Sequence, residues 1–298
     1  MMNVKHVGVS AILLASMMWA LEPILAKLSY RNANFLETSA IRAIFVTLTA
    51  LGYTGLRRKQ TLAVGRRQLA VLVYIAIAGT LVADLVYFLA LTRVPIINAV
   101  LIGHMQPVFI VLLAFFFLRE DRLARFDWVG VAFMIMAAFL VTTRTIGNFI
   151  SLKFGSSGDL LVLAATIAWA TTAIAMRRYL RGMSPGVMAF YRYLFASAVF
   201  AIYLISTSGI RIANVYQVLV GIVAGIGTVM YYEALTRIKA AQVSALELST
   251  PFFAAILAFF VLGELVTTLQ IIGIFSLFVG IYCLSKREEK AALQNDSL

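Results

Sequence analysis

Charged residues are scarce in this chain. Only 13% of its 298 residues are charged, whereas 62% are hydrophobic. A soluble protein of this length needs more charge to cover its surface, so the composition predicts an integral membrane protein with almost no extramembrane domain. The formal net charge is +12, but no nucleic-acid motif accompanies it, so no nucleic-acid partner is expected.

Residues that build disulfides, metal sites and nucleotide sites are also few. The single cysteine, Cys283, excludes a disulfide within one chain and a cysteine-based metal site. The two histidines, His6 and His104, belong to no cluster at ligand spacing, which leaves an integral-membrane enzyme as a remote alternative only. The chain has no Gly-Lys-Ser/Thr phosphate loop, which excludes a primary pump in a single chain. No cofactor and no metal are therefore expected.

Long apolar segments are what the chain has in abundance. Each of ten such segments has about the 17–25 residues that a helix needs to cross roughly 30 Å of hydrocarbon. Because lipid offers no hydrogen-bond partners, each segment must satisfy its own backbone groups and is predicted to be a helix. The predicted helices cover residues 7–26, 35–56, 68–92, 95–118, 127–144, 158–180, 186–208, 214–236, 240–262 and 267–285.

Lysine and arginine are unevenly divided between the two sides of these spans. With a cytoplasmic N-terminus, 17 of the 25 fall on the cytoplasmic side and five fall outside, while Lys27, Arg42 and Arg192 lie within or at the edge of a span. Cytoplasmic loops carry the excess of these residues in membrane proteins, so both termini are predicted to be cytoplasmic. The short loops and the lack of a targeting signal favour a prokaryotic cell (inner) membrane.

The chain contains a second copy of itself. Residues 87–120 match residues 231–264 at 13 of 34 positions with an offset of 144, and the first parts of the two halves match with an offset of 150. The match predicts a first repeat over residues 5–144, a joining loop over 145–157, a second repeat over 158–285 and a polar cytoplasmic tail over 286–298. Each repeat has five spans, so the second copy inserts upside down. Such inverted repeats are typical of alternating-access transporters.

Four pairs of equivalent residues point to a family. They are Trp19/Trp169, Arg42/Arg192, Pro107/Pro251 and Glu120/Glu264. Together with ten spans in two inverted repeats and short loops, they resemble the drug/metabolite transporter superfamily, in its EamA-like branch, over nearly the whole chain. The resemblance implies a central cavity lined by helices from both repeats, with outward-open and inward-open states. It also implies a small-molecule substrate drawn from amino acids, amines, sugars, nucleotide sugars and other metabolites.

Polar residues that occur in both copies are expected to serve the shared fold. Arg42 and Arg192 belong to this set, as do Glu120 and Glu264. By inversion, Arg42 is expected near the outer face and Arg192 near the inner face, each meeting the Glu at the end of the opposite repeat or a helix C-terminus. We interpret these residues and the two repeated prolines as gate or scaffold. The alternative is that the two arginines bind an anion directly.

Polar residues that occur in one copy only are expected to serve a substrate, because a substrate is asymmetric. Five ionisable residues of this kind lie within apolar spans: Glu22, Asp84, His104, Glu233 and Glu247. An ionisable group at membrane depth is unfavourable unless paired or hydrated, and it marks by default a substrate, ion or proton path. The structural alternative is a buried pair, such as Glu22 with Lys27. Glu233 is explained by an i,i+4 pair with Arg237.

Prolines strengthen two of these candidates. A proline inside a helix frees the carbonyl four residues earlier. For Pro251 this carbonyl belongs to Glu247, and for Pro107 it belongs to Gly103, next to His104. Loosened turns are tolerated in membranes where they line a cavity or meet another helix. Glu247 and His104 can also change protonation, so they are the proton-coupling candidates.

Aromatic residues flank the same level of the spans. Trp19 is one turn from Glu22, Tyr87 follows Asp84 by three residues, and Tyr231 is the copy of Tyr87. Carboxylates beside aromatic faces suit an organic cation. The predicted substrate-binding residues are therefore Glu22, Trp19, Asp84, Tyr87, His104, Glu247 and Tyr231.

The predicted function is secondary active or facilitative transport of a small polar organic metabolite by alternating access, with proton coupling left open. The substrate is predicted to be cationic or zwitterionic, such as an amino acid, an amine or a quaternary ammonium compound. The alternative substrate is an anion such as a nucleotide sugar or a sugar phosphate. The predicted partners are a small-molecule substrate and the lipid bilayer, and homodimerisation is left open.

Overall fold

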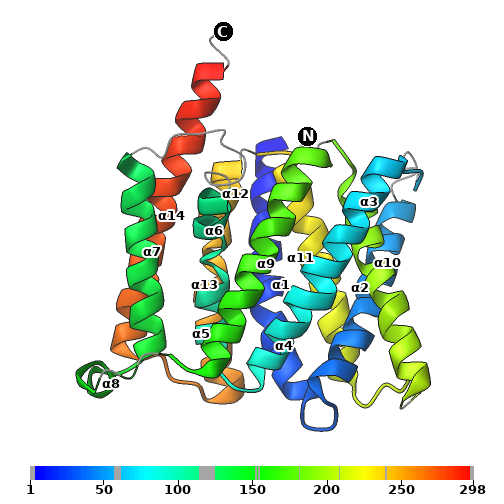
Figure 1. Ribbon diagram of the computed structural model, residues 1–298, viewed down its shortest axis with the longest axis horizontal. Coiled ribbons are helices and arrows are strands. Elements are labelled where there is room, and N and C mark those ends of the chain that lie inside the picture. Colours follow the sequence, from blue (N-terminus) through cyan, green and yellow to red (C-terminus); the bar gives the residue numbers. More distant parts are fainter. Residues whose placement is uncertain are drawn as a thin grey trace.

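The computed structural model describes residues 4–56, 62–113, 125–151, 153, 155–180, 182–207, 209–238 and 240–295. Within these residues the chain is helical and has no strand, and the long helices stand side by side in one bundle (Figure 1). Seven of the helices are long and apolar enough to cross a membrane, and three shorter apolar helices accompany them in the described part of the chain. The predicted all-helical membrane fold is confirmed.

The first half of the chain forms a series of helices that ends in a short connecting helix. They are α1 (Val4–Ser29), α2 (Phe35–Leu56), α3 (Arg66–Ile75), η1 (Ala76–Asp84), α4 (Leu85–Leu91), α5 (Ile96–Gly103), α6 (Gln106–Leu113), α7 (Arg125–Thr143) and α8 (Ile146–Ile150). The segment η1 is a π-helix of nine residues, and it joins α3 to α4 in one continuous span. The short helix α8 lies in the connection to the second half.

The second half contributes six further helices. They are α9 (Ser157–Tyr179), α10 (Pro185–Ser206), α11 (Val215–Leu235), α12 (Ala240–Glu247), α13 (Ser249–Leu262) and α14 (Thr268–Asn295). Each of the ten ranges predicted from the sequence falls on helix, although the range 95–118 extends beyond the described residues after 113. The start of α1 and the end of α14 lie at the same end of the bundle (Figure 1), as expected for termini on one side of a membrane.

Local signals in the sequence set several helix ends. Asp159 and Ser156 cap α9 reciprocally: the Ser156 hydroxyl accepts from the Asp159 N–H (3.2 Å), and the Asp159 carboxylate accepts from the Ser156 N–H (2.8 Å). Asp159 also accepts from the Asn98 amide (2.8 Å), whose oxygen accepts from Gln270 (2.7 Å). These bonds tie the starts of α5, α9 and α14 together at one end of the bundle.

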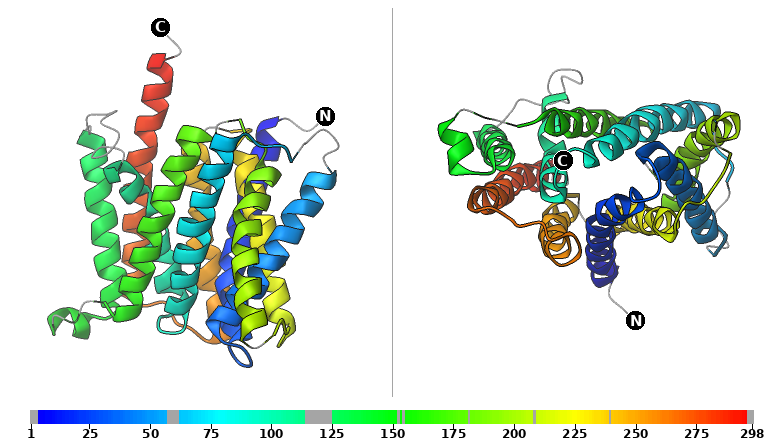
Figure 2. Two further views of the ribbon diagram at one scale, coloured as in Figure 1. Left: turned by 45° about the vertical axis from the view of Figure 1, so that its right-hand side comes forward. Right: turned by 90° about the horizontal axis from the view of Figure 1, so that it is seen from below.

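The two halves cross each other rather than packing separately. Helix α1 packs against α11, and α9 packs against η1 and α4, so the first span of each half contacts the third span of the other. Figure 2 shows α1 (dark blue) beside α11 (yellow) in both views. The Trp19 ring of α1 packs at a tilt against the Tyr231 ring (centroids 4.9 Å apart). Its copy Trp169 packs in the same way against Tyr87 (5.2 Å). The internal repeat of the sequence is therefore also a repeat of contacts.

One contact marks the axis that relates the two halves. Helix α2 packs against α10, and the Thr47 and Ser197 hydroxyls lie 2.9 Å apart within this seam. These two residues are equivalent, since they differ by the same offset of 150 that relates Arg42 to Arg192. A residue can touch its own copy only at the pseudo-twofold axis, so the axis passes through the α2–α10 seam.

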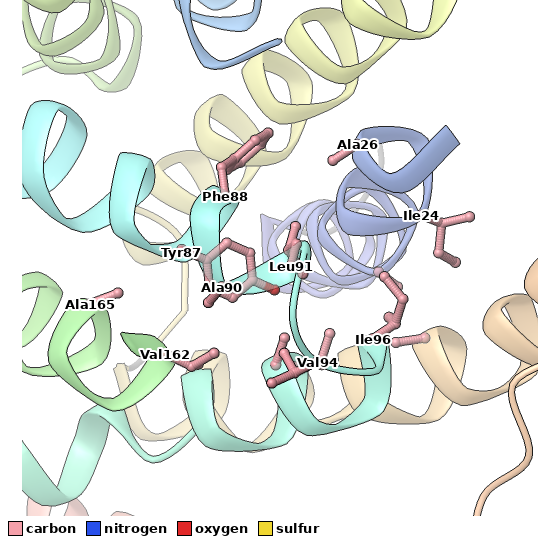
Figure 3. Close-up of a cluster of buried hydrophobic side chains, with 14 of the residues drawn as sticks. Ile24, Ala26, Tyr87, Phe88, Ala90, Leu91, Val94, Ile96, Val162 and Ala165 are labelled. Atoms are coloured by element: carbon pink, nitrogen blue, oxygen red, sulfur yellow. The ribbon is translucent and has the colours of Figure 1, made fainter. Parts of the chain in front are cut away.

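A hydrophobic cluster holds the site-bearing helices in place. It joins α1, α4, α5 and α9 through buried side chains that include Ile24, Phe88, Leu91 and Val162 (Figure 3). Tyr87 belongs to the same cluster, with 9% of its surface exposed. The cluster fixes α4 against α1, and thereby fixes the aromatic face of Phe88 that the site uses.

Glycine permits the close approach of α11 to α2. A Cβ atom added to Gly221 would lie 2.4 Å from the Phe45 Cβ and 2.8 Å from the backbone oxygen of Arg42. The Gly221→Ala variant is therefore expected to lose about 1–3 kcal/mol of stability, because the helices must separate. Gly52, also within a helix, has nothing within 4 Å of such a Cβ and is the matched control. Melting of the detergent-purified variants should show Gly52→Ala as unchanged or slightly stabilised, and equal melting temperatures would contradict the close approach.

Candidate functional site

Four buried ionisable side chains from both halves of the chain form one network. The Arg42 Nε donates to Glu22 Oε1 (2.6 Å), and the Arg42 Nη1 donates to Asp84 Oδ2 (2.9 Å). The Arg192 Nη2 donates to Asp84 Oδ1 (3.2 Å). No side chain of this charge quartet, Glu22, Arg42, Asp84 and Arg192, is more than 13% exposed. Two carboxylates and two guanidinium groups balance one another, which is what permits four charges to lie within apolar spans.

Asp84 is the centre of the quartet. Besides the two arginines, it accepts hydrogen bonds from the Trp169 Nε1 (2.7 Å, to Oδ1) and from the Tyr193 hydroxyl (3.2 Å, to Oδ2). Both carboxylate oxygens thus accept two donors each. A carboxylate so fully engaged positions the residues around it, and it has little capacity left for a ligand while these bonds last.

The π-helix explains how Asp84 reaches this position. Asp84 is the last residue of η1, whose wider turns alter the side-chain register relative to an α-helix. The Gly79 carbonyl of η1 accepts from the Trp169 Nε1 and from the Arg192 Nη2, both at 3.3 Å. Thr80 accepts from the Arg192 Nε (3.0 Å). A Cβ on Gly79 would lie 3.3 Å from the Arg192 Nη2, so glycine leaves room for the guanidinium group.

Aromatic rings cover the two arginines. The Arg42 guanidinium carbon lies 5.0 Å from the centroid of Phe88 and 5.4 Å from that of Tyr193. The Arg192 guanidinium carbon lies 5.1 Å from the same Tyr193 ring. Tyr193 therefore stands between the two cations and also bonds Asp84. Its role was not predicted, although its equivalent in the first repeat is Ala43, so the comparison of the two copies could have singled it out.

The structure corrects the expected partners of the repeated charges. Arg42 was expected to meet Glu264, but Glu264 instead accepts from the Lys27 Nζ (2.8 Å) and from the Ile96 N–H (2.7 Å). Glu22, expected with Lys27 in the structural alternative, bonds Arg42 instead. The physical reason is that both arginines find an asymmetric carboxylate at their own depth. Glu120, the expected partner of Arg192, lies outside the described residues.

Glu233 forms the pair that its spacing indicates. It accepts from the Arg237 guanidinium group four residues later, and also from the Tyr53 hydroxyl (2.9 Å). This pair at the end of α11 is separate from the charge quartet.

Two helix breaks occupy equivalent places in the two halves. Helix α5 ends at Gly103 and α12 ends at Glu247, and these two residues differ by the offset of 144. Pro107 and Pro251 each lie four residues after the last residue of the helix that precedes the break. The breaks divide what would otherwise be single spans.

Each break carries one ionisable residue. The His104 Nδ1 lies 2.7 Å from the Val100 carbonyl oxygen, so this nitrogen carries the proton and Nε2 is an acceptor. The Nε2 is buried and has no hydrogen-bond partner among the described residues. The Glu247 carboxylate makes neither a hydrogen bond nor an ion pair within the described part of the chain.

The predicted site residues therefore fall into two groups. Arg42 joins Glu22 to Asp84, and Trp169 joins Asp84 to Tyr87. Trp19 and Tyr231 form the second group, on α1 and α11, and α12 packs against both of these helices as well as against α14. Glu247 ends α12. His104 lies at the break of the other half, where a Cβ on Gly103 would be 3.9 Å from Trp169.

An all-helical bundle of two crossed halves, with equivalent helix breaks and a buried charge network, defines a membrane protein of the inverted-repeat transporter class. The model of the EamA-like transporter family matches residues 6–143 and 156–286, so the chain belongs to that family. It is a multi-pass integral membrane protein.

Individual relatives agree with the family. An uncharacterized transporter of Methanothermobacter thermautotrophicus is 25% identical over 74% of this chain and 65% of its own length. One of Synechocystis is 26% identical over 72% of this chain and 65% of its own length, and the uncharacterized transporter YyaM of Bacillus subtilis is 22% identical over 82% and 81%. The chain thus spans about 65% of the length of the first two relatives.

A solved structure shares the fold. One protein crystal structure superposes with a TM-score of 0.64 at 22% identity, covering 95% of this chain and 96% of its own.

Proposed function

We propose that the chain is a secondary transporter that carries a small polar organic solute bearing a positive charge, either a cation or a zwitterion, by alternating access. The observation that carries this proposal is the Glu247 carboxylate, which has no partner among the described residues and ends a broken helix. Broken helices near the interface of inverted repeats are where such transporters bind substrates and ions.

Charge counting supports a cationic group on the substrate. The charge quartet is balanced, with two carboxylates against two guanidinium groups. When it is ionised, Glu247 adds one negative charge that no described residue pairs with. A lone charge at this depth is unfavourable, and a bound cation or a proton relieves it.

The neighbourhood of Glu247 supports an organic cation. In the first half, a Cβ at the equivalent Gly103 would face the ring of Trp169 at 3.9 Å. By the internal repeat, Glu247 is expected to face Trp19 in the same way, and Trp19 in turn packs against Tyr231. A carboxylate beside two aromatic faces attracts an ammonium group both by its charge and by cation–π contact.

The anionic alternative has less support. Arg42 and Arg192 lie within the spans with little exposed surface, and both are bonded to Asp84. An anionic substrate would have to compete with that carboxylate and would leave it without its counter-ions.

A ligand panel tests the proposed substrate class. The detergent-purified chain should be heated with amino acids, amines, quaternary ammonium compounds and nucleotide sugars in turn. A ligand that binds only the folded state stabilises it by about 2.7 kcal/mol at 100 times its Kd. We expect the melting temperature to rise with a cation or zwitterion and to stay unchanged with nucleotide sugars. A rise with the anions alone would contradict the proposal.

Proton coupling is examined in the same preparation once a ligand is known. The chain is reconstituted in vesicles, and uptake is measured with and without an imposed pH gradient. Uptake that follows the gradient supports proton binding at Glu247 or His104. Uptake that ignores the gradient removes proton coupling and leaves Glu247 as a substrate group.

A further inference from the structure

Two buried hydroxyl groups have no hydrogen-bond partner among the residues that the structure describes. Ser16 is 0% exposed and Thr250 is 1% exposed, and neither side-chain oxygen has a hydrogen-bond partner in the part of the chain that the structure describes. Helical serine and threonine side chains commonly bond the carbonyl of the preceding turn, as Thr166 does with Val162 (2.8 Å). Buried polar groups are nearly always hydrogen-bonded, so these two hydroxyls require an explanation.

Helix packing brings both hydroxyls to the region of the break that follows Glu247. Thr250 is the second residue of α13, three residues after Glu247. Ser16 lies on α1, which packs against both α12 and α13. Its neighbour Ala15 shares a hydrophobic cluster with Val243 of α12, and Ala20, one turn further on, shares another with Ala254 of α13. Along α1, Ser16 thus lies between residues whose hydrophobic clusters include the two sides of the break.

The first half shows what the residue equivalent to Ser16 contacts. Thr166 is the copy of Ser16, and its hydroxyl also reaches the Ile102 carbonyl (3.4 Å), in the last turn before the break of α5. There, however, Gly103 and Gln106 stand in the places of Glu247 and Thr250. Only the second half combines a carboxylate with two hydroxyls that lack partners within the described residues.

We propose that Glu247, Ser16 and Thr250 together accept the three N–H groups of a primary ammonium, so that the transporter prefers primary amines to quaternary ammonium compounds. This inference rests on the proposed function and narrows its substrate class. A primary ammonium offers three donors, which matches one carboxylate and two hydroxyl acceptors. A quaternary ammonium has no N–H, so it would leave both hydroxyls without a partner.

Access to these hydroxyls requires a conformational change. Both oxygens are covered by protein in this structure, whereas Glu247 itself is partly exposed. A ligand reaches them when α1 moves away from the break between α12 and α13. Alternating access includes such a movement of one part of each half against the other.

A matched pair of ligands tests the inference. Ethanolamine and choline share a skeleton and differ in whether the nitrogen carries hydrogens. Binding of each is measured on the detergent-purified full chain and on the Ser16→Ala, Thr250→Val and doubly substituted variants. Thr166→Ala, at the equivalent place in the first half, is the control. We expect the wild type to favour ethanolamine by about tenfold or more, as lost hydrogen bonds to a charged group imply. The double variant should lose most of this preference, and Thr166→Ala should keep it.

Ligand-free melting separates binding from folding. Replacing hydroxyls that have no partner by apolar groups is expected to leave the melting temperature unchanged or higher, so that weaker ethanolamine binding reflects the site rather than damage. Equal affinity of the wild type for both ligands, or a preference that survives the double substitution, overturns the inference while the proposed function stands. If sodium chloride stabilises the protein and neither amine does, the oxygens of Glu247, Ser16 and Thr250 bind an inorganic cation. This result would also overturn the inference. If neither amine binds, this inference fails, and the ligand panel described above decides separately whether the proposed cationic substrate class stands.

Discussion

Among single substitutions in the charge quartet, Asp84→Asn is expected to lower the stability of the protein most. Asp84 accepts from Arg42, Arg192, Trp169 and Tyr193, and its side chain is only 5% exposed. Asparagine keeps the shape but removes the negative charge, which leaves two buried guanidinium groups against Glu22 alone. Breaking a buried ion pair from one side typically costs about 3–5 kcal/mol. Thermal melting in detergent should show a large fall, together with a loss of folded yield.

Two further variants test whether charge balance is the cause. The Lys27–Glu264 pair is about one-fifth exposed, so Glu264→Gln is expected to cost only about 1 kcal/mol. Combining Asp84→Asn with Arg192→Gln removes one charge of each sign, and the double variant should therefore be less destabilised than the sum of the single ones. Additive effects would show that shape, rather than charge balance, makes Asp84 necessary.

The Glu247→Gln variant is expected to lose ligand binding without losing stability. The Glu247 carboxylate has no partner in the described residues, so neutralising it removes an unfavourable charge, and the ligand-free melting temperature should stay unchanged or rise. Truncating one partner of a buried charge pair typically costs about 2–5 kcal/mol, which corresponds to at least about 30-fold weaker binding of a cationic ligand. Thermal melting measures both quantities: the melting temperature without ligand reports the stability, and its rise on adding ligand reports the binding.

Glu233→Gln is the control for this experiment. Glu233 is another carboxylate within the spans of the second half, but it is buried and paired with Arg237 and Tyr53. Its substitution should leave the affinity for the ligand unchanged and lower the stability slightly. If Glu247→Gln binds the ligand as tightly as the wild type, Glu247 does not touch the substrate, and the proposed site is wrong.

Features of the fold that depend on local sequence could be predicted. The spans follow from the length of apolar segments, as in α2, whose bounds Phe35–Leu56 coincide with the predicted range 35–56. The helix breaks lie one turn before Pro107 and Pro251, where a proline removes a backbone donor, but Pro23 lies within α1 without breaking it, so a proline marks a candidate position only. The pair of Glu233 with Arg237 follows from helical spacing alone.

Features that depend on how the halves cross were not predictable. Asp84 meets Arg42 because of the register of η1, and nothing in the sequence of Ala76–Asp84 predicts a π-helix. Tyr193 gains its place from the crossing of α10 with α2, which no spacing along the chain reveals. The comparison of the two copies singled out Asp84 and Glu22 as asymmetric, but it contained no information about which cation each would meet.

The contact between Thr47 and Ser197 constrains the motion of the transporter. In one form of alternating access, each half adopts the conformation that the other half had before. Every contact in one state is then replaced in the other state by the contact between the equivalent residues. The bond between Thr47 and Ser197 is its own copy, because each residue occupies the other's position after the exchange. Under the alternating access proposed above, the α2–α10 seam is therefore the contact that both conformations share, and the two halves would turn about it as about a fulcrum.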